Sequence, residues 1–392
     1  MNKETPETTF MKWTVSFCSY GIDIARRDQT TLETLTGNNW LKDADGKTVA
    51  VFYTGFGAAW GAGSFGMGGT PKDGARLPKT LRLSYYDYLE DRFYRLNAEL
   101  PLQRLFELFV RAPKIVARKV TYGEVAPRYR DLRIGVAPDG HVMLWVWGVG
   151  SQVELGAYRG QVLAGMTRQS YNASVPGGAF TLIEDRWLAL DRMKPETVER
   201  VKAGWRPDPM WYVRHIRVKY PWRHVLSGNV SRVTELQSHQ GNAEAESVGQ
   251  WEMSTYAQVN RLRGVPETAF FWFHDRQGQR HYLWVTFSLH ERAVSEADLS
   301  EVRAAFEEVF PGRTLEDNDW LPGDQDMAQV EVHVPDDFRR FSAFLVKDDR
   351  RLPLPVGRVQ HFKLEPFTHW AGQTSDEVTP EMRKLFQMGP PV

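Results

Sequence analysis

A chain of 392 residues is longer than one hydrophobic core usually supports, which predicts two domains. Lysine plus arginine and aspartate plus glutamate are equal at 49 each, so the formal net charge is zero. This balance excludes a nucleic-acid or anionic-membrane binder that works by bulk charge. Aromatic residues make up 12% of the chain, which favours packed β structure over disorder.

Cys18 is the only cysteine, so an internal disulfide and a thiolate metal cluster are both excluded. No segment reaches the roughly 18 apolar residues of a membrane-spanning helix. The polar start MNKETPETTF also lacks the apolar stretch of a signal peptide. We therefore expect a cytoplasmic protein, or a periplasmic or lipid-anchored one if an export signal precedes this start.

The first half of the chain predicts strands interrupted by one short helix. Alternating apolar residues indicate strands, and Pro101 can occupy the first turn of a helix. Between the early strands lies a glycine-rich stretch, residues 55–74. The expected order is strands at 13–20, 48–54, 80–87 and 92–99, the helix after Pro101, a hairpin turned at Pro138-Asp139-Gly140, and a last strand within 152–162.

The second half repeats this order after a helical segment in which Pro195 begins a second turn of helix. Its main helix is expected over 295–310, with Ser295 as N-cap and an apolar stripe for packing on a sheet, namely Leu299, Val302, Ala305, Phe306 and Val309. The expected strands are one at 211–220, a hairpin turned at Gln277-Gly278, a hairpin within 328–347, and a last strand within 357–367.

The repeat extends to single residues. Leu77-Pro78-Lys79-Thr80 matches Val265-Pro266-Glu267-Thr268, and without a gap Asp87, Arg92 and Tyr94 then fall on Asp275, Arg280 and Tyr282. We expect an α+β, mostly β fold made of two similar β-sandwich-like domains, each with a helix packed on a sheet. The first repeat domain is expected at residues 1–182, a helical connector at 183–206, and a second, divergent repeat domain at 207–392.

The glycine-rich stretch contains Gly61-x-Gly63-x-x-Gly66, which matches a dinucleotide-binding fingerprint. That motif needs a turn from a strand into a helix whose N-terminus faces the pyrophosphate. Here glycine, proline and lysine follow instead of a helix. A glycine-rich surface loop is therefore the preferred interpretation.

Nine of the ten histidines lie in the second half, yet none shows the helical spacing of a metal site. His274 and His281 flank a hairpin turn and could approach each other across it. We interpret them as polar strand residues. The chain also lacks the G-x-S-x-G motif of a nucleophile elbow, so no catalytic residue, metal ligand or cofactor is expected.

Residues 316–326, EDNDWLPGDQD, carry five acids in eleven positions without the spacing of a calcium loop. A solvated loop is the simplest interpretation. The alternative is a contact loop in which Trp320 anchors an interface with a charged rim.

Several ordered motifs carry a resemblance to a known family. They are the glycine-rich stretch, LPKTLRLSYYDYLEDRFYRLNAELP, IGVAPDGHVMLWVWG and VELGAYRGQ, all within residues 13–162. This part resembles the bacterial domain of unknown function 2931 family, and the second half resembles it only through the first. Members are mostly Gram-negative proteins, many of them lipoproteins, and some are encoded beside secreted antibacterial effectors, including lipases delivered by type VI secretion.

The resemblance implies a non-enzymatic immunity protein that binds and neutralises such an effector, and it supplies no catalytic residue. We expect the contacts in two loops, through Trp60, Phe65 and Met67 of the glycine-rich stretch and through Asp317, Asp319, Trp320 and Asp324 of the acidic one. The alternatives are an adaptor or chaperone that loads a secreted effector, and a ligand-binding module or uncharacterised enzyme.

Overall fold

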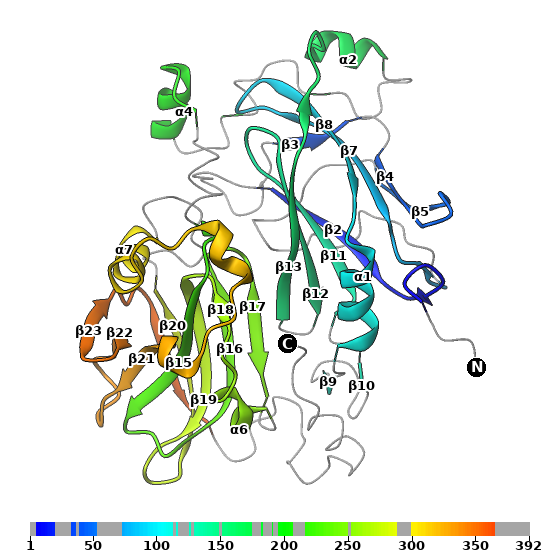
Figure 1. Cartoon of the computed structure of the whole chain (residues 1–392). Helices are drawn as coiled ribbons and strands as arrows, with labels where there is room; N and C mark the ends of the chain where they lie inside the picture. The colour runs from blue at the N-terminus through cyan, green and yellow to red at the C-terminus, as the bar shows by residue number, and fades with distance from the viewer. Residues whose placement is uncertain are drawn as a thin grey trace. The chain divides into compact units, whose positions relative to one another are not determined.

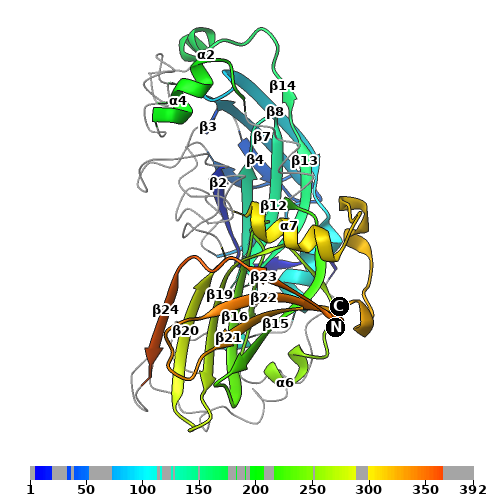
Figure 2. The ribbon, with the colours of Figure 1, turned by 90° about the vertical axis from the view of Figure 1, so that its left-hand side faces the viewer.

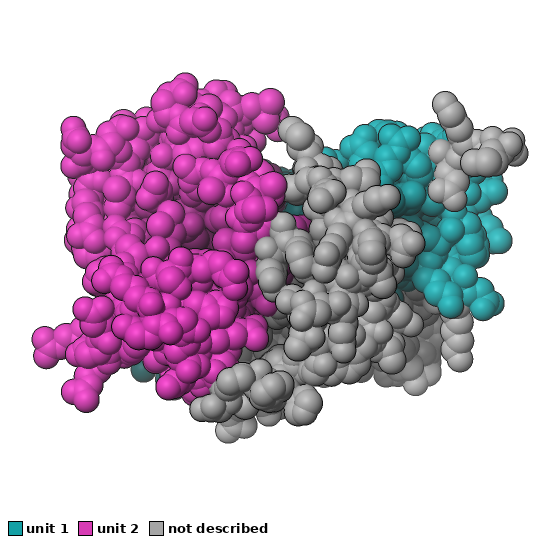
Figure 3. All heavy atoms as spheres, turned by 90° about the horizontal axis from the view of Figure 1, so that it is seen from below, with its two compact units in different colours: residues 1–111, 129–148, 153–209 teal, residues 112–128, 149–152, 210–392 magenta. Residues whose placement is uncertain are grey.

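The computed structural model consists of two compact units, coloured separately in Figure 3. Unit 1 comprises residues 1–111, 129–148 and 153–209, and unit 2 comprises residues 112–128, 149–152 and 210–392. The residues that the structure describes are 5–19, 33–36, 39–52, 73–112, 115–116, 125–126, 129–148, 151–174, 182, 190, 195–206, 216–249, 252–287 and 299–364. Strands dominate both units, which confirms the expected α+β, mostly β class (Figure 1).

Unit 1 has two principal sheets. The first has the order β2 (Thr14–Ser19), β11 (Asp131–Val136), β12 (His141–Gly148), β13 (Ser151–Arg159), with β2 parallel to β11. The second has the order β14 (Gln161–Val162), β8 (Arg92–Glu99), β7 (Thr80–Asp87), β4 (Asn39–Lys42), β5 (Thr48–Phe52), and β3 (Glu33–Leu35) also pairs with β7. Two short strands, β1 (Phe10–Met11) and β6 (Ala75–Arg76), pair separately.

Aromatic side chains join the two sheets of unit 1. The ring of Phe17 on β2 lies 4.5 Å from that of Phe52 on β5, and both side chains are fully buried. The Tyr85 hydroxyl on β7 donates to the Ala137 carbonyl at the end of β11. Burying an aromatic side chain of this kind contributes about 2–3 kcal/mol. Unit 1 is therefore sandwich-like, as expected.

The helices of unit 1 are short. The segment after Pro101 forms α1 (Leu102–Phe106) and continues as a π-helical turn (Glu107–Arg111), with Leu105, Phe106, Leu108 and Phe109 buried. Further along lie α2 (Arg168–Ser174) and α4 (Pro195–Lys202). Val198 and Val201 of α4 pack in one apolar cluster with Leu89 and Phe93 of the β7–β8 hairpin. The part of the predicted connector that the structure describes thus includes a helix that packs on unit 1.

Unit 2 also has two principal sheets (Figure 2). The first has the order β18 (Leu262–Arg263), β15 (Tyr220–Gly228), β21 (Ala328–Val334), β22 (Ser342–Lys347), β23 (Arg350–Leu354), with β15 parallel to β21. The second has the order β17 (Ala245–Val248), β16 (Arg232–Gln240), β19 (Pro266–His274), β20 (Arg280–Thr286), β24 (Val359–Lys363). The short helix α6 (Met253–Tyr256) and the paired strands β9 (Ile115–Val116) and β10 (Val125–Ala126) also belong to this unit.

The sheets of unit 2 face each other across His224. Its ring on β15 makes an edge contact with Phe271 on β19, and its Nε2 lies 2.9 Å from the Ser238 hydroxyl on β16. Helix α7 (Ser300–Val309) packs at the start of β15, where Phe306 contacts Tyr220 and Trp222. The predicted stripe of this helix is buried throughout, so the expected helix on a sheet is confirmed here.

The two units share one order of strand pairings. The strands β2, β11, β12 and β13 of unit 1 correspond in chain order to β15, β21, β22 and β23 of unit 2. In the other sheet, β14, β8, β7, β4 and β5 correspond to β24, β20, β19, β16 and β17. The helices α1 and α7 each follow the central hairpin of their unit. Each unit also contains one parallel pair at the same place in this order.

The correspondence extends to exposed residues on the last strand. Val162 on β14 lies opposite Tyr94, and Phe362 on β24 lies opposite Tyr282. Tyr94 and Tyr282 are the tyrosines that the sequence repeat aligned. Val162 is 49% exposed and Phe362 is 52% exposed, so both units present an apolar side chain at the same position.

One predicted strand is wrong. Residues 216–219, the described end of the strand expected at 211–220, are not in a strand, and β15 begins only at Tyr220. The side chain of Asn318 explains the difference, because its Nδ2 donates to the Arg217 carbonyl and its Oδ1 accepts from the Lys219 amide. These backbone groups are satisfied without a neighbouring strand. Strands β16, β17 and β23 had no counterpart in the expected order.

Candidate functional site

The acidic segment predicted as a contact loop lies on unit 2 as two short 3₁₀ helices, Leu315–Asp319 and Asp324–Asp326, with Trp320 and Leu321 between them. Trp320 is 42% exposed and Leu321 is 76% exposed. We call residues 315–326 the Trp320 segment. The structure therefore brings Asp317, Asp319, Trp320 and Asp324 together on one surface segment.

Hydrogen bonds hold the Trp320 segment in place at both ends. Asp317 accepts from the Thr314 amide at 2.8 Å, and Arg313 donates to the Asp317 carbonyl at 3.0 Å. The guanidinium of Arg313 also lies 5.1 Å from the centre of the Trp320 ring. At the other end, Asp324 accepts from the Asn260 side chain at 2.6 Å.

Two of the predicted contact acids therefore have a structural task as well as exposure. Asp317 caps the first 3₁₀ helix, and Asp324 ties the second one to the segment before β18. Asp319 and Glu316 are exposed beside Trp320 and remain available to solvent or to a partner. The Trp320 segment thus presents an apolar pair with an acidic border on a fixed backbone.

The other predicted contact residues, Trp60, Phe65 and Met67, lie outside the described residues, and so does the glycine-rich fingerprint. Their role stays a prediction. Ser295, the predicted N-cap, also lies outside the described residues, and the described helix has Leu299 at its N-cap.

Sequence reasoning missed a second site, which is built around His281 on β20. His281 and His274 do not approach each other across the hairpin, because His281 lies opposite Phe273 and His274 lies opposite Arg280. Successive side chains of a strand point to opposite faces. His281 instead contacts Asp275 at the start of the turn and His361 on β24.

These three side chains form a hydrogen-bonded chain that we call the Asp275–His281–His361 chain. His281 Nε2 lies 3.0 Å from Asp275 Oδ2, and His281 Nδ1 lies 2.9 Å from His361 Nε2. The other carboxylate oxygen of Asp275 accepts from the backbone amides of Gln277 and Gln279 at 3.0 and 2.8 Å. Asp275 and His281 are buried, whereas His361 is only half-buried.

The electrostatics of the chain follow from this geometry. Burial works against ionisation of Asp275, but its hydrogen bonds with His281 and with the Gln279 amide outweigh burial and lower the pKa of the carboxyl group. Partial burial and the neighbouring His281 lower the pKa of His361. The chain therefore runs from an ionised carboxylate in the interior to a neutral imidazole at the surface.

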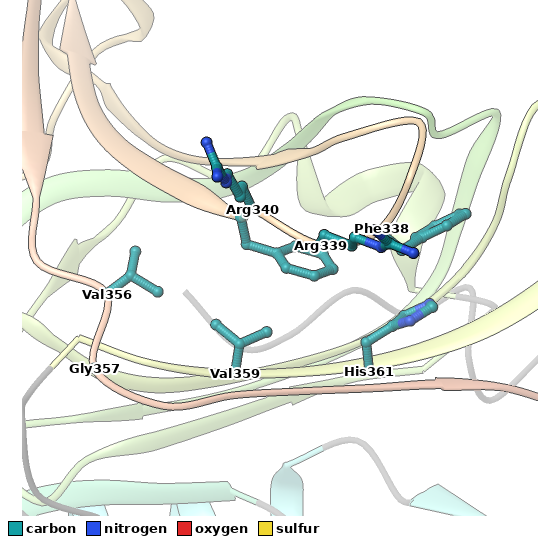
Figure 4. Close-up of a pocket in the computed structure, with 8 residues that line it drawn as sticks. Phe338, Arg339, Arg340, Val356, Gly357, Val359 and His361 are labelled. Carbon is teal, nitrogen blue, oxygen red and sulfur yellow. The ribbon is translucent and has the colours of Figure 1, made fainter.

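His361 opens into a hollow of about 520 Å³, shown in Figure 4. The lining comes from the loop between β21 and β22 and from the segment that leads into β24: Phe338, Arg339, Arg340, Phe341, Val356, Gly357, Val359 and His361. Phe338 lies over the rings of both His281 and His361, at centroid distances of 4.6 and 4.5 Å. This size and mixed lining are typical of a small-ligand site.

The corresponding place in unit 1 has lost the two imidazoles. The sequence repeat aligns Asp275 with Asp87, and the same register places Phe93 and Gln161 where His281 and His361 stand. Asp87 still accepts from the backbone amides of its turn, at Leu89 and Glu90. The carboxylate therefore serves the hairpin turn in both units, and the histidine chain is particular to unit 2.

Metal and membrane signals are missing from the part of the chain that the structure describes. No group of three or more histidine, cysteine or acidic side chains there is arranged to hold a metal ion. Among the same residues, no helix is long and apolar enough to span a membrane.

Comparisons with known proteins give one finding. Neither the comparison with curated proteins nor the comparison with solved structures found a match. Among family models, the one described as "Protein of unknown function (DUF2931)" matches residues 1–186. This match covers the motifs between residues 13 and 162 on which the resemblance rested. The first half of the chain therefore carries a DUF2931 domain.

Proposed function

We propose that the protein is a non-enzymatic binding protein that neutralises a secreted antibacterial effector by covering part of it with the Trp320 segment. One observation carries the proposal: a tryptophan and a leucine are exposed side by side on a segment that side-chain hydrogen bonds hold in one conformation. The role of immunity protein, and a type VI effector such as a lipase as the partner, come from the family resemblance.

The exposed pair has the features of an interface anchor. Tryptophan is enriched among residues that contribute most to binding, and such residues are surrounded by polar groups that exclude water. Because the Trp320 segment is already fixed by Asp317 and Asp324, binding would cost little conformational entropy. The exposed acids Glu316 and Asp319 favour a partner with a basic rim around an apolar pocket.

We also propose that residues 210–364 are a second, divergent copy of the first-half domain. The shared order of strand pairings supports this proposal, and so do the aligned Asp87 and Asp275 in equivalent turns. The Trp320 segment comes between α7 and β21, so it belongs to the second copy alone. Partner binding is then a property that the second copy acquired.

An adaptor or chaperone would use the same surface, because it must hold the effector without blocking it. The two roles differ in their effect on the effector's activity and not in the surface buried. A rescue assay separates them: an immunity protein restores the growth of cells that produce the effector, and an adaptor does not.

The test combines capture with rescue. The full chain and its Trp320→Ala/Leu321→Ala variant are used to capture effectors from a culture with active secretion systems, and each captured effector is then produced in cells with either form. We expect the wild type to bind one effector and to restore growth, and the variant to lose both properties. Phe362→Ala removes an equally exposed apolar side chain elsewhere on unit 2 and is the matched control. Equal binding by the wild type and the Trp320 variant would overturn the proposal.

A further inference from the structure

We propose that the hollow beside His361 binds a small organic anion, with its oxyanion group on Arg339 and Arg340 and its apolar body on the phenyl and valine side chains, and that the Asp275–His281–His361 chain takes up a proton when it binds. The ligand class is a carboxylate or phosphate attached to an aromatic or aliphatic body. This inference is independent of the Trp320 segment and of the proposed role in effector binding.

The cations of the hollow are uncompensated. Arg339 and Arg340 are exposed at its edge, and neither forms an ion pair with another described residue (Figure 4). The nearby Asp337 caps the Arg339 backbone amide at 3.1 Å. Guanidinium groups match the geometry of carboxylates and phosphates and can bind them with two hydrogen bonds. Two adjacent arginines at the mouth of a hollow therefore favour an anionic ligand.

The remaining lining suits an apolar body. Phe338, Phe341, Val356 and Val359 supply most of the other side chains around the hollow. Its volume of about 520 Å³ lies within the usual range for small-ligand sites, about 300–1,000 Å³. An inorganic ion would leave this apolar surface in contact with water. The lining thus selects an anion that carries a hydrocarbon or aromatic part.

Phe338 shows that the loop above the histidines is built with a constraint. Its φ is 54°, in the left-handed region that a bulky aromatic residue rarely adopts. Such strain persists only where the surroundings impose it, and it is concentrated at functional sites. The conformation places the Phe338 ring nearly parallel to the His361 ring, with an interplanar angle of 4°. The loop therefore holds the arginines and the histidine chain on opposite sides of one aromatic ring.

The histidine chain can move a proton inward without leaving a lone buried charge. When His361 gains a proton on Nδ1, its Nε2 proton can pass to Nδ1 of His281, which keeps its own Nε2 proton on Asp275. One proton enters from solvent, and the positive charge comes to rest beside the Asp275 carboxylate. An anion in the hollow favours this uptake, because it stabilises positive charge on the chain.

Other charges on the surrounding elements modulate this uptake. The β16, β19 and β20 strands and their turn contribute Arg232, Glu235, His274, Arg276 and Arg280; the β24 region contributes Arg358 and Lys363; and the β21–β22 loop contributes Asp336, Asp337, Arg339 and Arg340. Arginine and lysine predominate in this set. Without a ligand they oppose protonation of His361, so anion binding and proton uptake reinforce each other.

Calorimetric titration of the full chain with phenyl phosphate and with benzoate at pH 7 tests the proposal. We expect saturable binding of at least one of the two, and an observed heat that changes between two buffers of different ionisation enthalpy, since a proton is taken up. Benzyl alcohol and inorganic phosphate are the neutral and body-less controls, and both should bind more weakly by about tenfold or more. Binding of neither organic anion, or equal binding of either control, would overturn the proposal.

Variants separate the two parts of the site. Arg339→Ala/Arg340→Ala should weaken the anion by about tenfold or more, whereas Arg104→Ala, an exposed arginine on α1 of unit 1, should leave it unchanged. His361→Gln should retain measurable binding but remove the dependence of the heat on the buffer. Unchanged affinity in the double arginine variant, or an undiminished buffer dependence in His361→Gln, would contradict the assignment. Thermal unfolding of each variant confirms that it is folded before titration.

Discussion

Arg263 and Glu246 form a double hydrogen bond in the interior of unit 2, from Nε to Oε2 at 2.7 Å and from Nη2 to Oε1 at 3.2 Å. Arg263 is 1% exposed and Glu246 is 7% exposed. Arg263 also donates to the Trp222 carbonyl, and the Trp222 indole donates to the Gly264 carbonyl. The pair therefore links β17, β18 and β15 at the edges of the two sheets.

Removing one member of this pair leaves the other charge buried without its partner. We expect Glu246→Gln to lower the free energy of unfolding by about 3–5 kcal/mol, measured by urea denaturation at pH 7. The exposed pair of Glu199 and Lys202 on α4 is the control, because a solvent-screened pair contributes about 1 kcal/mol or less. Similar losses in Glu246→Gln and Glu199→Gln would contradict the prediction.

The same pair predicts a loss of stability in acid. Burial raises the pKa of Glu246, but Arg261 and Arg263 outweigh burial and lower it from 4.5 to about 2. The unfolded chain therefore takes up a proton at this carboxyl group before the folded one does. The stabilisation is complete above pH 4.5 and is lost as the pH falls toward 2. Urea denaturation between these values should show a smaller slope with pH in Glu246→Gln than in the wild type.

His224 predicts a second pH effect in a higher range. Burial and the positive charge of Arg263 lower the pKa of His224 from 6.5 to about 3, so the folded chain keeps this imidazole neutral. The unfolded chain binds a proton below pH 6.5, and stability therefore decreases as the pH falls from 6.5 toward 3. Between pH 6.5 and 5 the loss should be about 2 kcal/mol. Denaturation of His224→Gln should lack this part of the pH dependence, and an unchanged profile would exclude His224 as its source.

Two glycines with the same backbone angle predict different costs. Gly228 at the end of β15 and Gly278 in the β19–β20 turn both have φ of +82°. A Cβ on Gly228 would lie 2.1 Å from the Val334 carbonyl oxygen, whereas a Cβ on Gly278 would meet nothing within 4 Å. Gly278→Ala should cost only the backbone strain, about 1–2 kcal/mol.

Gly228→Ala should add the displacement of β21 to that strain and cost about 3 kcal/mol or more in total. Chemical denaturation of both variants measures the difference. Equal costs would show that β21 moves aside without penalty at this position.

Helix α7 should depend on one side chain. Phe306 is fully buried against Tyr220 and Trp222, so Phe306→Ala should lower the free energy of unfolding by about 3–5 kcal/mol through the cavity it leaves. Phe362→Ala removes the same ring from an exposed position and should change stability by about 0.5 kcal/mol or less. Thermal and urea unfolding of both variants test whether α7 packs as described.

Local pattern was sufficient for the elements whose contacts are close in the chain. The β7 and β8 strands have the predicted bounds, because alternating residues and a tight turn specify a hairpin. The stripe on α7 is buried as expected, because helical spacing already places those side chains on one face. The glycine-rich contact residues and the role in effector binding stay predictions.

Contacts between distant residues decided the rest. Asn318 occupies the backbone groups of Arg217 and Lys219, about a hundred positions away, and no local pattern shows that a side chain will replace a strand there. His281 and His361 are 80 positions apart and meet only because β20 pairs with β24 in one register. A shift of one residue would turn His361 to the other face of the sheet.

The sequence by itself determined the mostly β class, the central hairpins, the helix that packs on unit 2 and the exposed acidic segment, because periodicity and turn residues act over a few positions. Only the tertiary structure decided which strands pair, and with them the Asp275–His281–His361 chain and its hollow. Strand pairing depends on the total burial and hydrogen bonding of segments far apart in the chain, which no single stretch of sequence specifies.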